Sequence, residues 1–322
     1  MAPRRTALIR TAVIGVGYLG RFHAQKYAGL PNSRLVGIAD PSSAARAAVG
    51  AELNVAAHAD YRSLLGSVDA VSIVTPTASH FEVARAFLEA GASVLVEKPM
   101  TVTIAEGEAL VKIAADARRI LQVGHLERFN AAVLAVQPTL TTPRFIESAR
   151  LAPFKHRGTD VDVVLDLMIH DIDLILSIVR SPVVSVDAIG SSVFSKEIDI
   201  ANARLRFANG CVANATASRV SLKTERKLRL FQDDAYLSLD LQQKILTVIR
   251  KGAGVGADGM PQVAIEENTY EQGDALKAEI EAFLEAIATG RAPPVSGEDG
   301  LLALRTAVSI AQQVASSMQK FS

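Results

Sequence analysis

The sequence predicts an α/β protein with an N-terminal doubly wound parallel sheet and a C-terminal α/β domain built on a large, mostly antiparallel open sheet. Through the first 125 residues, short apolar runs alternate with amphipathic stretches, and a glycine-rich turn follows the first run. After residue 126 the rhythm changes to successive strand-like runs separated by turn signals. Since a chain of 322 residues is also typical of two domains, we expect residues 1–125 to form one domain and residues 126–322 the other.

The first domain contains five apolar runs of the length expected for buried parallel strands. They are TAVIG (11–15), RLVGIAD (34–40), AVSIVTP (70–76), SVLVEKP (93–99) and ILQVGH (120–125). The stretches between these runs have helical periodicity. We expect helices near residues 19–30, 42–51, 79–90 and 104–118. This alternation predicts a Rossmann-type sheet, in which ligands bind beyond the carboxyl ends of the strands.

The second domain begins with an expected helix at residues 127–136 and an expected strand near 144–151, before a loop that contains KHRG (155–158). A long helix is predicted over residues 160–179. Further runs have the alternation or β-branching that is typical of strands. They lie at about 183–192, 199–207, 211–220, 227–232, 235–240 and 244–250. Two helices, at about 274–288 and 299–318, are expected at the end of the chain.

Hydrophobic residues make up 49% of the chain, which is enough for two cores, yet no apolar run reaches the roughly 18 residues that a membrane-spanning helix needs. The N-terminal stretch is predicted to be a first strand behind a short tail rather than an export signal, because Arg10 interrupts its apolar segment. The single cysteine, Cys211, excludes an internal disulfide. We therefore expect a soluble cytoplasmic protein with no membrane partner.

The charges of the chain are balanced, with 34 basic and 34 acidic side chains. A neutral whole-molecule field gives no reason to expect a nucleic acid or an anionic membrane as a partner. The absence of tryptophan and the aromatic content of 5% also argue against a platform for stacking bases. The expected partner is a small molecule.

A G-x-G-x-x-G motif falls at Gly15, Gly17 and Gly20, directly after the first strand and at the start of the first helix. Glycines at these positions permit a tight turn and let the backbone approach a pyrophosphate, which the helix N-terminus stabilises. Asp40 ends the second strand, where its carboxylate can accept hydrogen bonds from ribose hydroxyls and repel a 2′-phosphate. NAD is therefore favoured over NADP as the cofactor. The NADP alternative depends on Ser42, Ser43 and Arg46.

Two segments carry candidate catalytic residues. Lys98, in the EKP sequence at the end of the fourth strand, is expected where a doubly wound sheet binds its ligand. In the predicted helix 160–179, a polar stripe interrupts an apolar surface at helical spacing. Its members are Asp162, Asp166, His170, Asp173 and Ser177. The alternative is a water-facing side of an amphipathic helix. No metal site is expected, because a lysine ammonium would compete with the ion and no further His or Cys ligand is evident.

Motifs in both domains resemble the glucose–fructose oxidoreductase and inositol dehydrogenase (Gfo/Idh/MocA) family in their order and approximate spacing. They are GVGYLGRFHA (15–24), TPTASH (75–80), VEKP (96–99) and Asp166-x-x-x-His170-x-x-Asp173. The resemblance implies that Lys98, Asp166 and His170 meet at a sugar substrate. It also implies that, with the glycines, Asp40 and Lys98, other residues of the first domain bind the cofactor. They are Tyr18, Leu19, Thr75, Pro76, His80, Glu97 and Pro99.

The implied roles fit the oxidation of a secondary alcohol, which loses its hydroxyl proton and delivers a hydride to nicotinamide. An imidazole, with an ordinary pKa of about 6.5, can accept that proton, so His170 is the expected base. Lys98 is expected to donate a hydrogen bond to the oxygen and to stabilise the charge that develops on it. Asp166 is expected to orient the His170 ring or to contact a neighbouring hydroxyl.

Further segments resemble the branch of this family that oxidises C3 of UDP-N-acetylglucosamine and so prepares a 3-amino sugar for lipid A. They are VGHLERFNAAV (123–133), GTDVDVVLDLMIHDID (158–173), DIANARLRF (199–207), GCVANATASRVS (210–221) and DAYLSLD (234–240). The resemblance implies a nucleotide-sugar substrate, and several cations can neutralise its diphosphate unless they are solvated surface charges. The expected substrate-binding residues are Lys98, Arg128, Lys155, Arg157, Asp166, His170 and Arg219.

Two alternatives to this function stay open. One is a dehydrogenase of a free sugar, inositol or another polyol, because Leu167, Met168 and Ile169 are bulky where the family often has small residues. The other is a non-catalytic, NAD-responsive regulatory protein on the same fold. In each case the open sheet of the second domain would leave a large face exposed, which predicts self-association as a homodimer or a homotetramer.

Overall fold

A computed structural model describes residues 8–154, 161–255, 259–271 and 273–319. The chain divides into two compact units. The first comprises Met1–Leu126 and Asp274–Leu302, and the second comprises Glu127–Gly273 and Ala303–Ser322. The sequence-based division placed all of residues 126–322 together, whereas in the structure residues 274–302 pack with the first unit.

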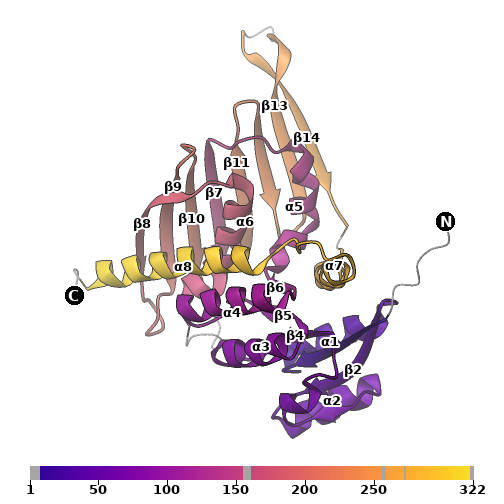
Figure 1. Cartoon of the computed structure of the whole chain (residues 1–322). Helices are drawn as coiled ribbons and strands as arrows, with labels where there is room; N and C mark the ends of the chain where they lie inside the picture. The colour runs from indigo at the N-terminus through magenta and orange to yellow at the C-terminus, as the bar shows by residue number, and fades with distance from the viewer. Residues whose placement is uncertain (1–7, 155–160, 256–258, 272, 320–322) are drawn as a thin grey trace, which may run out of the picture. The chain divides into compact units, whose positions relative to one another are not determined.

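The first unit contains a six-stranded parallel sheet with the order β3-β2-β1-β4-β5-β6 (Figure 1). The strands are β1 (Ile9–Ile14), β2 (Ser33–Ala39), β3 (Ala57–His58), β4 (Ala70–Ile73), β5 (Ser93–Glu97) and β6 (Leu121–Gly124). The chain order reverses between β1 and β4, so the carboxyl ends of these two strands mark the point where doubly wound sheets bind ligands.

Helices connect these strands and cover the sheet of the first unit. They are α1 (Tyr18–Gly29), α2 (Ser43–Leu53), α3 (His80–Glu89) and α4 (Ile104–Ala117), with the short turns η1 (Tyr61–Leu64) and η2 (Thr77–Ser79). Helix α7 (Ala275–Thr289) joins them from the far end of the chain, because its Phe283 and Leu284 are buried in one core with Val13 of β1 and Tyr27 of α1. This shared core explains why residues 274–302 belong to the first unit.

The second unit is built on an eight-stranded sheet with the order β14-β13-β12-β11-β7-β10-β9-β8. All neighbouring strands are antiparallel except β7 and β10. The strands are β7 (Phe145–Leu151), β8 (Val183–Ser191), β9 (Ile200–Phe207), β10 (Val212–Ser218), β11 (Glu225–Phe231), β12 (Ala235–Asp240), β13 (Ile245–Val255) and β14 (Pro261–Thr269). The predicted fold class is confirmed for both sheets.

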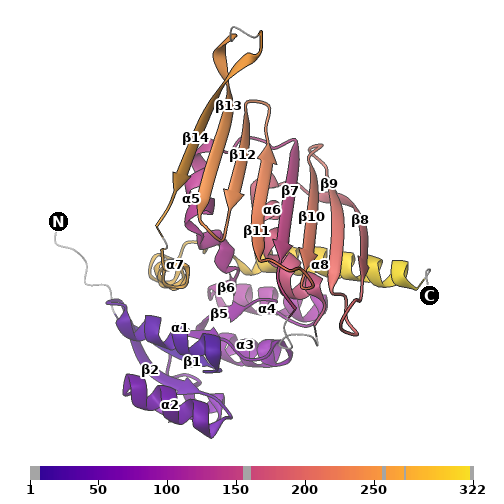
Figure 2. The same cartoon turned by 180° about the vertical axis from the view of Figure 1, so that it is seen from behind.

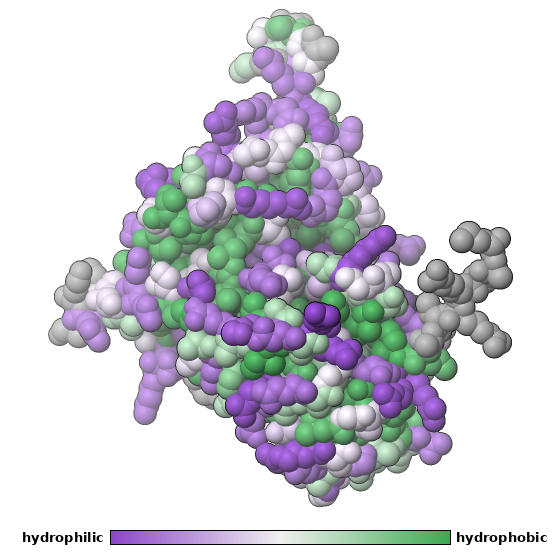
Figure 3. All heavy atoms as spheres, viewed as in Figure 1, coloured by the Kyte–Doolittle hydropathy of each residue, from purple (hydrophilic) through white to green (hydrophobic). Residues whose placement is uncertain are grey.

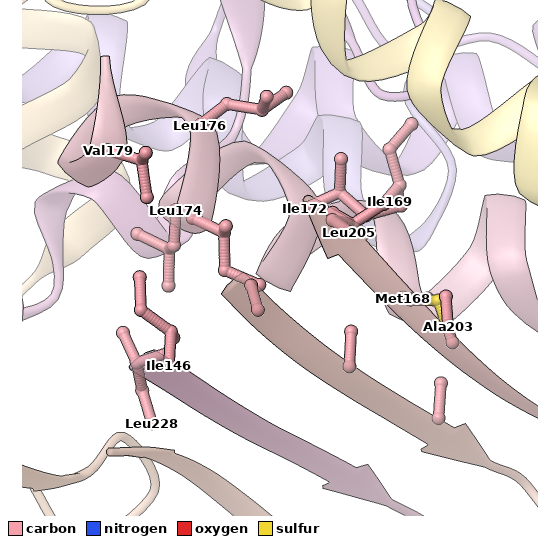
Figure 4. Close-up of a cluster of buried hydrophobic side chains, with 14 of the residues drawn as sticks. Ile146, Met168, Ile169, Ile172, Leu174, Leu176, Val179, Ala203, Leu205 and Leu228 are labelled. Carbon is pink, nitrogen blue, oxygen red and sulfur yellow. The ribbon is translucent and has the colours of Figure 1, made fainter. Parts of the chain in front are cut away.

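Helices cover one face of this sheet (Figure 1), and on the face seen in Figure 2 no helix of the described residues lies. The covering elements are η3 (Leu126–Phe129), α5 (Ala131–Val136), η4 (Gln137–Thr139), η5 (Val164–Met168), α6 (Ile169–Val179) and the part of α8 (Gly297–Met318) from residue 303 onward. Side chains of α6 such as Leu174 pack against Ile146 of β7 and Leu228 of β11 in a buried apolar cluster (Figure 4).

The structure differs from the predicted elements at two strands and at the start of one helix. Strand β3 has two residues, too few for a periodic signal, and β14 was not predicted. The predicted helix 160–179 starts later, with a π-helical turn over Val164–Met168 before the α-helix. Among the described residues, no helix combines the length and apolarity needed to traverse a bilayer. Hydrophilic and hydrophobic side chains are mixed over the face shown in Figure 3.

One buried carboxyl in the first unit lacks a hydrogen-bond partner among the described residues. Glu279 of α7 is fully buried, and both of its side-chain oxygens are unsatisfied. Burial and the nearby charge of Glu97 raise the pKa of the Glu279 carboxyl well above its usual range. The carboxyl is therefore neutral in the folded chain at a pH where it ionises in the unfolded chain.

We predict that Glu279→Gln makes the first unit less sensitive to rising pH. In the unfolded chain a glutamate side chain ionises at a pH of about 4.3, whereas folded Glu279 stays neutral. The free energy of unfolding therefore falls as the pH rises above that value. The gain in thermal midpoint from Glu279→Gln should therefore be larger at pH 7 than at pH 5. The control is Glu281→Gln, an exposed residue on the same helix. Equal shifts at the two pH values would contradict a neutral Glu279.

Candidate active site

The turn between β1 and α1 brings main-chain atoms unusually close together. Gly15 has φ +83°, and a Cβ atom there would lie 2.7 Å from the Val74 carbonyl oxygen. A Cβ on Gly20 would lie 1.8 Å from the Gly15 carbonyl oxygen, so no other residue fits without moving the backbone. At Gly17, the N-cap of α1, the corresponding space is open. The N–H groups of the first turn of α1 can therefore approach an anion closely.

A pocket of about 640 Å³ lies at the switch point of this sheet, and predicted cofactor-binding residues line it. They are Gly15, Gly17, Asp40, Thr75 and Pro76. The Thr75 hydroxyl is buried and has no hydrogen-bond partner among the described residues. The glycine turn, the helix N-terminus and the ribose-side carboxylate together fit a dinucleotide.

Asp40 joins the two loops at the rim of this pocket. Its Oδ2 accepts a hydrogen bond from the Val16 N–H at 2.8 Å, and its Oδ1 accepts one from the Ser42 N–H at 2.8 Å. These bonds hold the carboxylate in place while each oxygen keeps a lone pair for a ribose hydroxyl. Arg46, the cation of the NADP alternative, donates through Nη1 to the carbonyl oxygens of Asp40 and Pro41 at 2.7 and 2.8 Å. The Arg46 guanidinium therefore stabilises the backbone at the start of this loop.

His80 was predicted to bind the cofactor, and that contact stays a prediction. In the structure the His80 ring is buried between two backbone carbonyl groups. Its Nε2 lies 2.9 Å from the Thr75 carbonyl oxygen, and its Nδ1 lies 2.9 Å from the Pro99 carbonyl oxygen. Burial lowers the pKa of His80, so the neutral ring donates to one of these carbonyls at a time. The residue ties the loop after β4 to the EKP segment after β5.

Lys98 follows β5 and is half-buried. The preceding Glu97 carboxylate turns inward, where Oε1 lies 3.3 Å from Nε2 of the buried His23 and Oε2 accepts from the Lys98 N–H at 3.3 Å. Burial alone would raise the pKa of Glu97, but the His23 contact and the Lys98 charge lower that pKa below its usual range. Glu97 and Pro99 are not among the residues that line the pocket. Of the other predicted residues, Tyr18 and Leu19 begin α1, and the Tyr18 side chain is exposed.

In the second unit the π-helical turn changes the predicted polar stripe. A π turn contains more residues than an α turn, so positions before and after it are not separated by the α-helical angle. Asp162 accepts hydrogen bonds from the N–H groups of Val164 and Leu165 at 2.8 and 2.9 Å and so begins the helical segment. Asp166 lies in the π turn and His170 in the first turn of α6, and both side chains are half-buried.

Two buried aspartates closely follow His170, and each is paired with an arginine from another element. Arg128 donates through Nε and Nη2 to Asp173 at 2.6 and 2.8 Å. Arg150 donates through Nε and Nη2 to Asp171, both at 2.9 Å. Arg128 was predicted to contact the substrate, whereas the roles of Arg150 and Asp171 were not predicted. The sequence did contain a signal for this pair, because Arg150 falls on the inward face of the alternating strand β7. A buried guanidinium requires a buried carboxylate as its partner.

The remaining predicted substrate-binding cations are of two kinds. Arg219 is buried and donates to Asp199 Oδ1 at 3.0 Å and to the carbonyl oxygens of Val161 and Ile198 at 2.6 and 2.9 Å. These contacts give Arg219 a structural role, and its contact with a substrate stays a prediction. Lys155 and Arg157 lie outside the described residues.

Sequence comparison supports the two-part architecture. Residues 9–125 match the model of an oxidoreductase family with an NAD-binding Rossmann fold, and residues 132–238 match the GFO/IDH/MocA C-terminal domain. The chain is 42% identical over 313 residues to UDP-N-acetylglucosamine 3-dehydrogenase of Acidithiobacillus ferrooxidans, which covers 97% of this chain and 99% of that protein. It is 27% identical to inositol 2-dehydrogenase of Rhizobium meliloti, over 97% of this chain and 98% of that protein.

Solved structures agree with this comparison. The structure of UDP-N-acetylglucosamine 3-dehydrogenase GnnA from Acidithiobacillus ferrooxidans superposes with a TM-score of 0.90 at 42% identity, covering 95% of this chain and 97% of that chain. Levoglucosan dehydrogenase in complex with NADH superposes with a TM-score of 0.84 at 20% identity, covering 96% and 97%, which shows a shared fold. Residues 9–125 of the first unit form an NAD-binding Rossmann domain, and NAD is its cofactor.

We predict that Gly20→Ala weakens NAD binding at least about 10-fold, because the new methyl group clashes with the Gly15 carbonyl oxygen and opens the turn. Titration calorimetry with NAD measures this loss. The matched control is Gly29→Ala at the end of the same helix, where a Cβ meets no atom within 4 Å. The control should bind NAD as the unmodified protein does, and wild-type affinity in Gly20→Ala would contradict the role of the turn.

Proposed function

The chain belongs to the Gfo/Idh/MocA oxidoreductase family, and we propose that it oxidises the C3 hydroxyl of UDP-N-acetylglucosamine to a ketone with NAD as the hydride acceptor. The observation that carries this proposal is the similarity to UDP-N-acetylglucosamine 3-dehydrogenase, 42% identity along 97% of the chain. The glycine turn, Asp40, Lys98, Asp166 and His170 are all present for this chemistry. The 3-keto product is suited to the introduction of a 3-amino group, the use that the sequence resemblance implied.

We propose roles for three side chains at the reacting hydroxyl. His170 accepts the hydroxyl proton, because an imidazole titrates near neutral pH. Lys98 donates a hydrogen bond to the same oxygen and stabilises the negative charge that develops there. Asp166 orients the imidazole or binds a neighbouring hydroxyl. When bound, NAD accepts the hydride that leaves C3. The half-buried positions of these three residues are compatible with ligand contact.

The second candidate substrate is a free polyol. It is favoured by the similarity to inositol 2-dehydrogenase along nearly the whole chain, although the identity of 27% is lower. A nucleotide sugar differs from a polyol in its diphosphate, which requires cations. Lys155 and Arg157 remain proposed contacts for that diphosphate.

We predict that the protein reduces NAD when UDP-N-acetylglucosamine is added, followed as absorbance of the reduced nicotinamide. His170→Ala and Lys98→Met should each lower kcat/KM by about 10²–10⁴-fold, because each removes a group that acts on the reacting oxygen. NAD binding should persist in His170→Ala, since all residues that line the described cofactor pocket belong to the first unit.

The control for the lysine is Lys112→Met, an exposed residue of α4, which should leave turnover unchanged. Undiminished turnover in His170→Ala or Lys98→Met would refute the role assigned to that residue. Activity with inositol or free sugars alone, measured in the same assay, would move the substrate to the polyol class.

We also propose that the protein is a homo-oligomer, a dimer or a tetramer, in which second copies cover the open face of the eight-stranded sheet (Figure 2). Half-buried aromatic side chains follow one another across that face, with ring centroids 5.6 Å apart for Phe145 and Phe231 and 5.0 Å apart for Phe231 and Tyr236. Ile249 and Ile265 extend the row through their register in β13 and β14. An apolar row of this kind is typical of an interface core.

We predict that Tyr236→Arg lowers the assembly state measured by sedimentation velocity, because a charge would be buried in the aromatic row. The control is Leu134→Arg, at an exposed position of α5 on the helix-covered side of the sheet. A protein that sediments as a monomer before any substitution, or an oligomer that Tyr236→Arg leaves intact, would count against this interface.

A further inference from the structure

Two buried aspartates follow His170 within one helical turn, and each is held through two nitrogens of an arginine from another element. Arg150 of β7 holds Asp171, and Arg128 of η3 holds Asp173. Both aspartates are 1% exposed. We propose that Arg128 and Arg150 are positioning residues, which set the location and orientation of the His170 imidazole for the reaction. This inference depends on the proposed function of His170.

The two pairs are joined into one network by Glu127. Arg150 donates through Nη1 to Glu127 Oε1 at 2.9 Å, and Glu127 precedes Arg128 in η3. Asn130 donates through Nδ2 to Glu127 Oε2 at 3.2 Å and to the Leu241 carbonyl oxygen at 2.8 Å. The contacts therefore form a closed circuit from α6 to β7, from β7 to η3 and back to α6. A shift of one pair is resisted by the other.

Apolar packing already attaches α6 to the second unit, so these charged pairs are not needed for that purpose. Ile172, Leu174 and Ile175 are fully buried in the core of the second unit. A buried ion pair is often no more stabilising than an apolar pair of similar volume, because both ions lose their hydration. What it adds is geometry, since the planar guanidinium fork fixes the distance and direction of a carboxylate.

The π-helical turn before α6 explains why the position of this helix needs to be fixed by ion pairs. Val164–Met168 accommodates more residues per turn than the α-helix that follows, so the register of α6 is not determined by an unbroken α-helical ladder from the start of the segment. Apolar contacts tolerate small rotations and translations of a helix. Two bidentate pairs at Asp171 and Asp173 do not, and they fix the register of the turn that carries His170.

The test uses Arg128→Lys and Arg150→Lys, which keep the charge and remove the planar fork. Each should lower kcat with UDP-N-acetylglucosamine by about 10–100-fold, because a displacement of about 1 Å at a reacting group costs up to about 100-fold. The KM for NAD should not change. The control is Arg144→Lys, since Arg144 makes a bidentate pair with Asp233, both distances 3.0 Å, at the exposed surface.

Expressing kcat per NAD-binding site separates positioning from folding. A merely structural role would lower the number of folded sites and leave both the kcat of each site and the pH profile of kcat/KM unchanged. A positioning role lowers the kcat of each folded site. It also shifts the midpoint of the pH dependence of kcat/KM that is due to His170, which is the part of the profile that His170→Ala removes. In Arg144→Lys both quantities should equal those of the unmodified protein.

Imidazole NMR tests the proposal without a substrate. The His170 resonances are identified by their absence in His170→Ala, and their shifts and titration midpoint should change in Arg128→Lys and Arg150→Lys but not in Arg144→Lys. Should the unmodified protein fail to oxidise UDP-N-acetylglucosamine, the proposed substrate is wrong, while this measurement still decides the positioning role. Unchanged His170 resonances in both folded lysine variants would overturn it. If either variant does not fold, Asp173→Glu replaces it, because it keeps the charge and moves the carboxylate by one methylene.

Discussion

Burial of a carboxylate is costly unless a cation or hydrogen-bond donor compensates it, and the structure meets this constraint beside each residue proposed to act on the reacting oxygen. Glu97 precedes Lys98 in the first unit and contacts a buried histidine of α1. Asp171 follows His170 in the second unit and is held by an arginine of β7. In each case the functional side chain is half-buried and its neighbour is anchored to another element. The anchored neighbour restrains the backbone from which the functional side chain projects.

Most of the first unit could be predicted because its signals are local. Strand length, helical periodicity and the spacing of Gly15, Gly17 and Gly20 each depend on residues close together in the chain. The position of α7 depends instead on tertiary packing. Its periodicity predicted a helix, but only the burial of Phe283 and Leu284 against β1 and α1 shows which core the helix joins. For the same reason, the boundary of the first unit could not be derived from sequence order.

The candidate site in the second unit was predicted less completely, because its geometry depends on pairs that are distant in sequence. The polar stripe assumed equal α-helical steps, and the π turn invalidates that angle between Asp162 and His170. Arg128 was predicted as a substrate ligand, whereas in the structure Asp173, 45 residues away, accepts two of its hydrogen bonds. The alternating pattern of β7 predicts that the Arg150 side chain faces inward. It does not predict that Asp171 is the partner, since the sequence offers several other carboxylates.

The cofactor preference follows from how the pocket distributes charge. Three carboxylates line it, those of Asp40, Asp60 and Glu82, against one guanidinium, that of Arg62. Arg62 pairs with Asp60 at 3.2 Å and with Glu82 at 2.9 Å, so two of the three acids already oppose its charge. Arg46 donates to backbone carbonyls. A 2′-phosphate would therefore meet the Asp40 carboxylate with no uncompensated cation among the residues that line this pocket, whereas ribose hydroxyls would donate to that carboxylate. The same charge distribution that would repel the phosphate of NADP thus provides the acceptor for NAD.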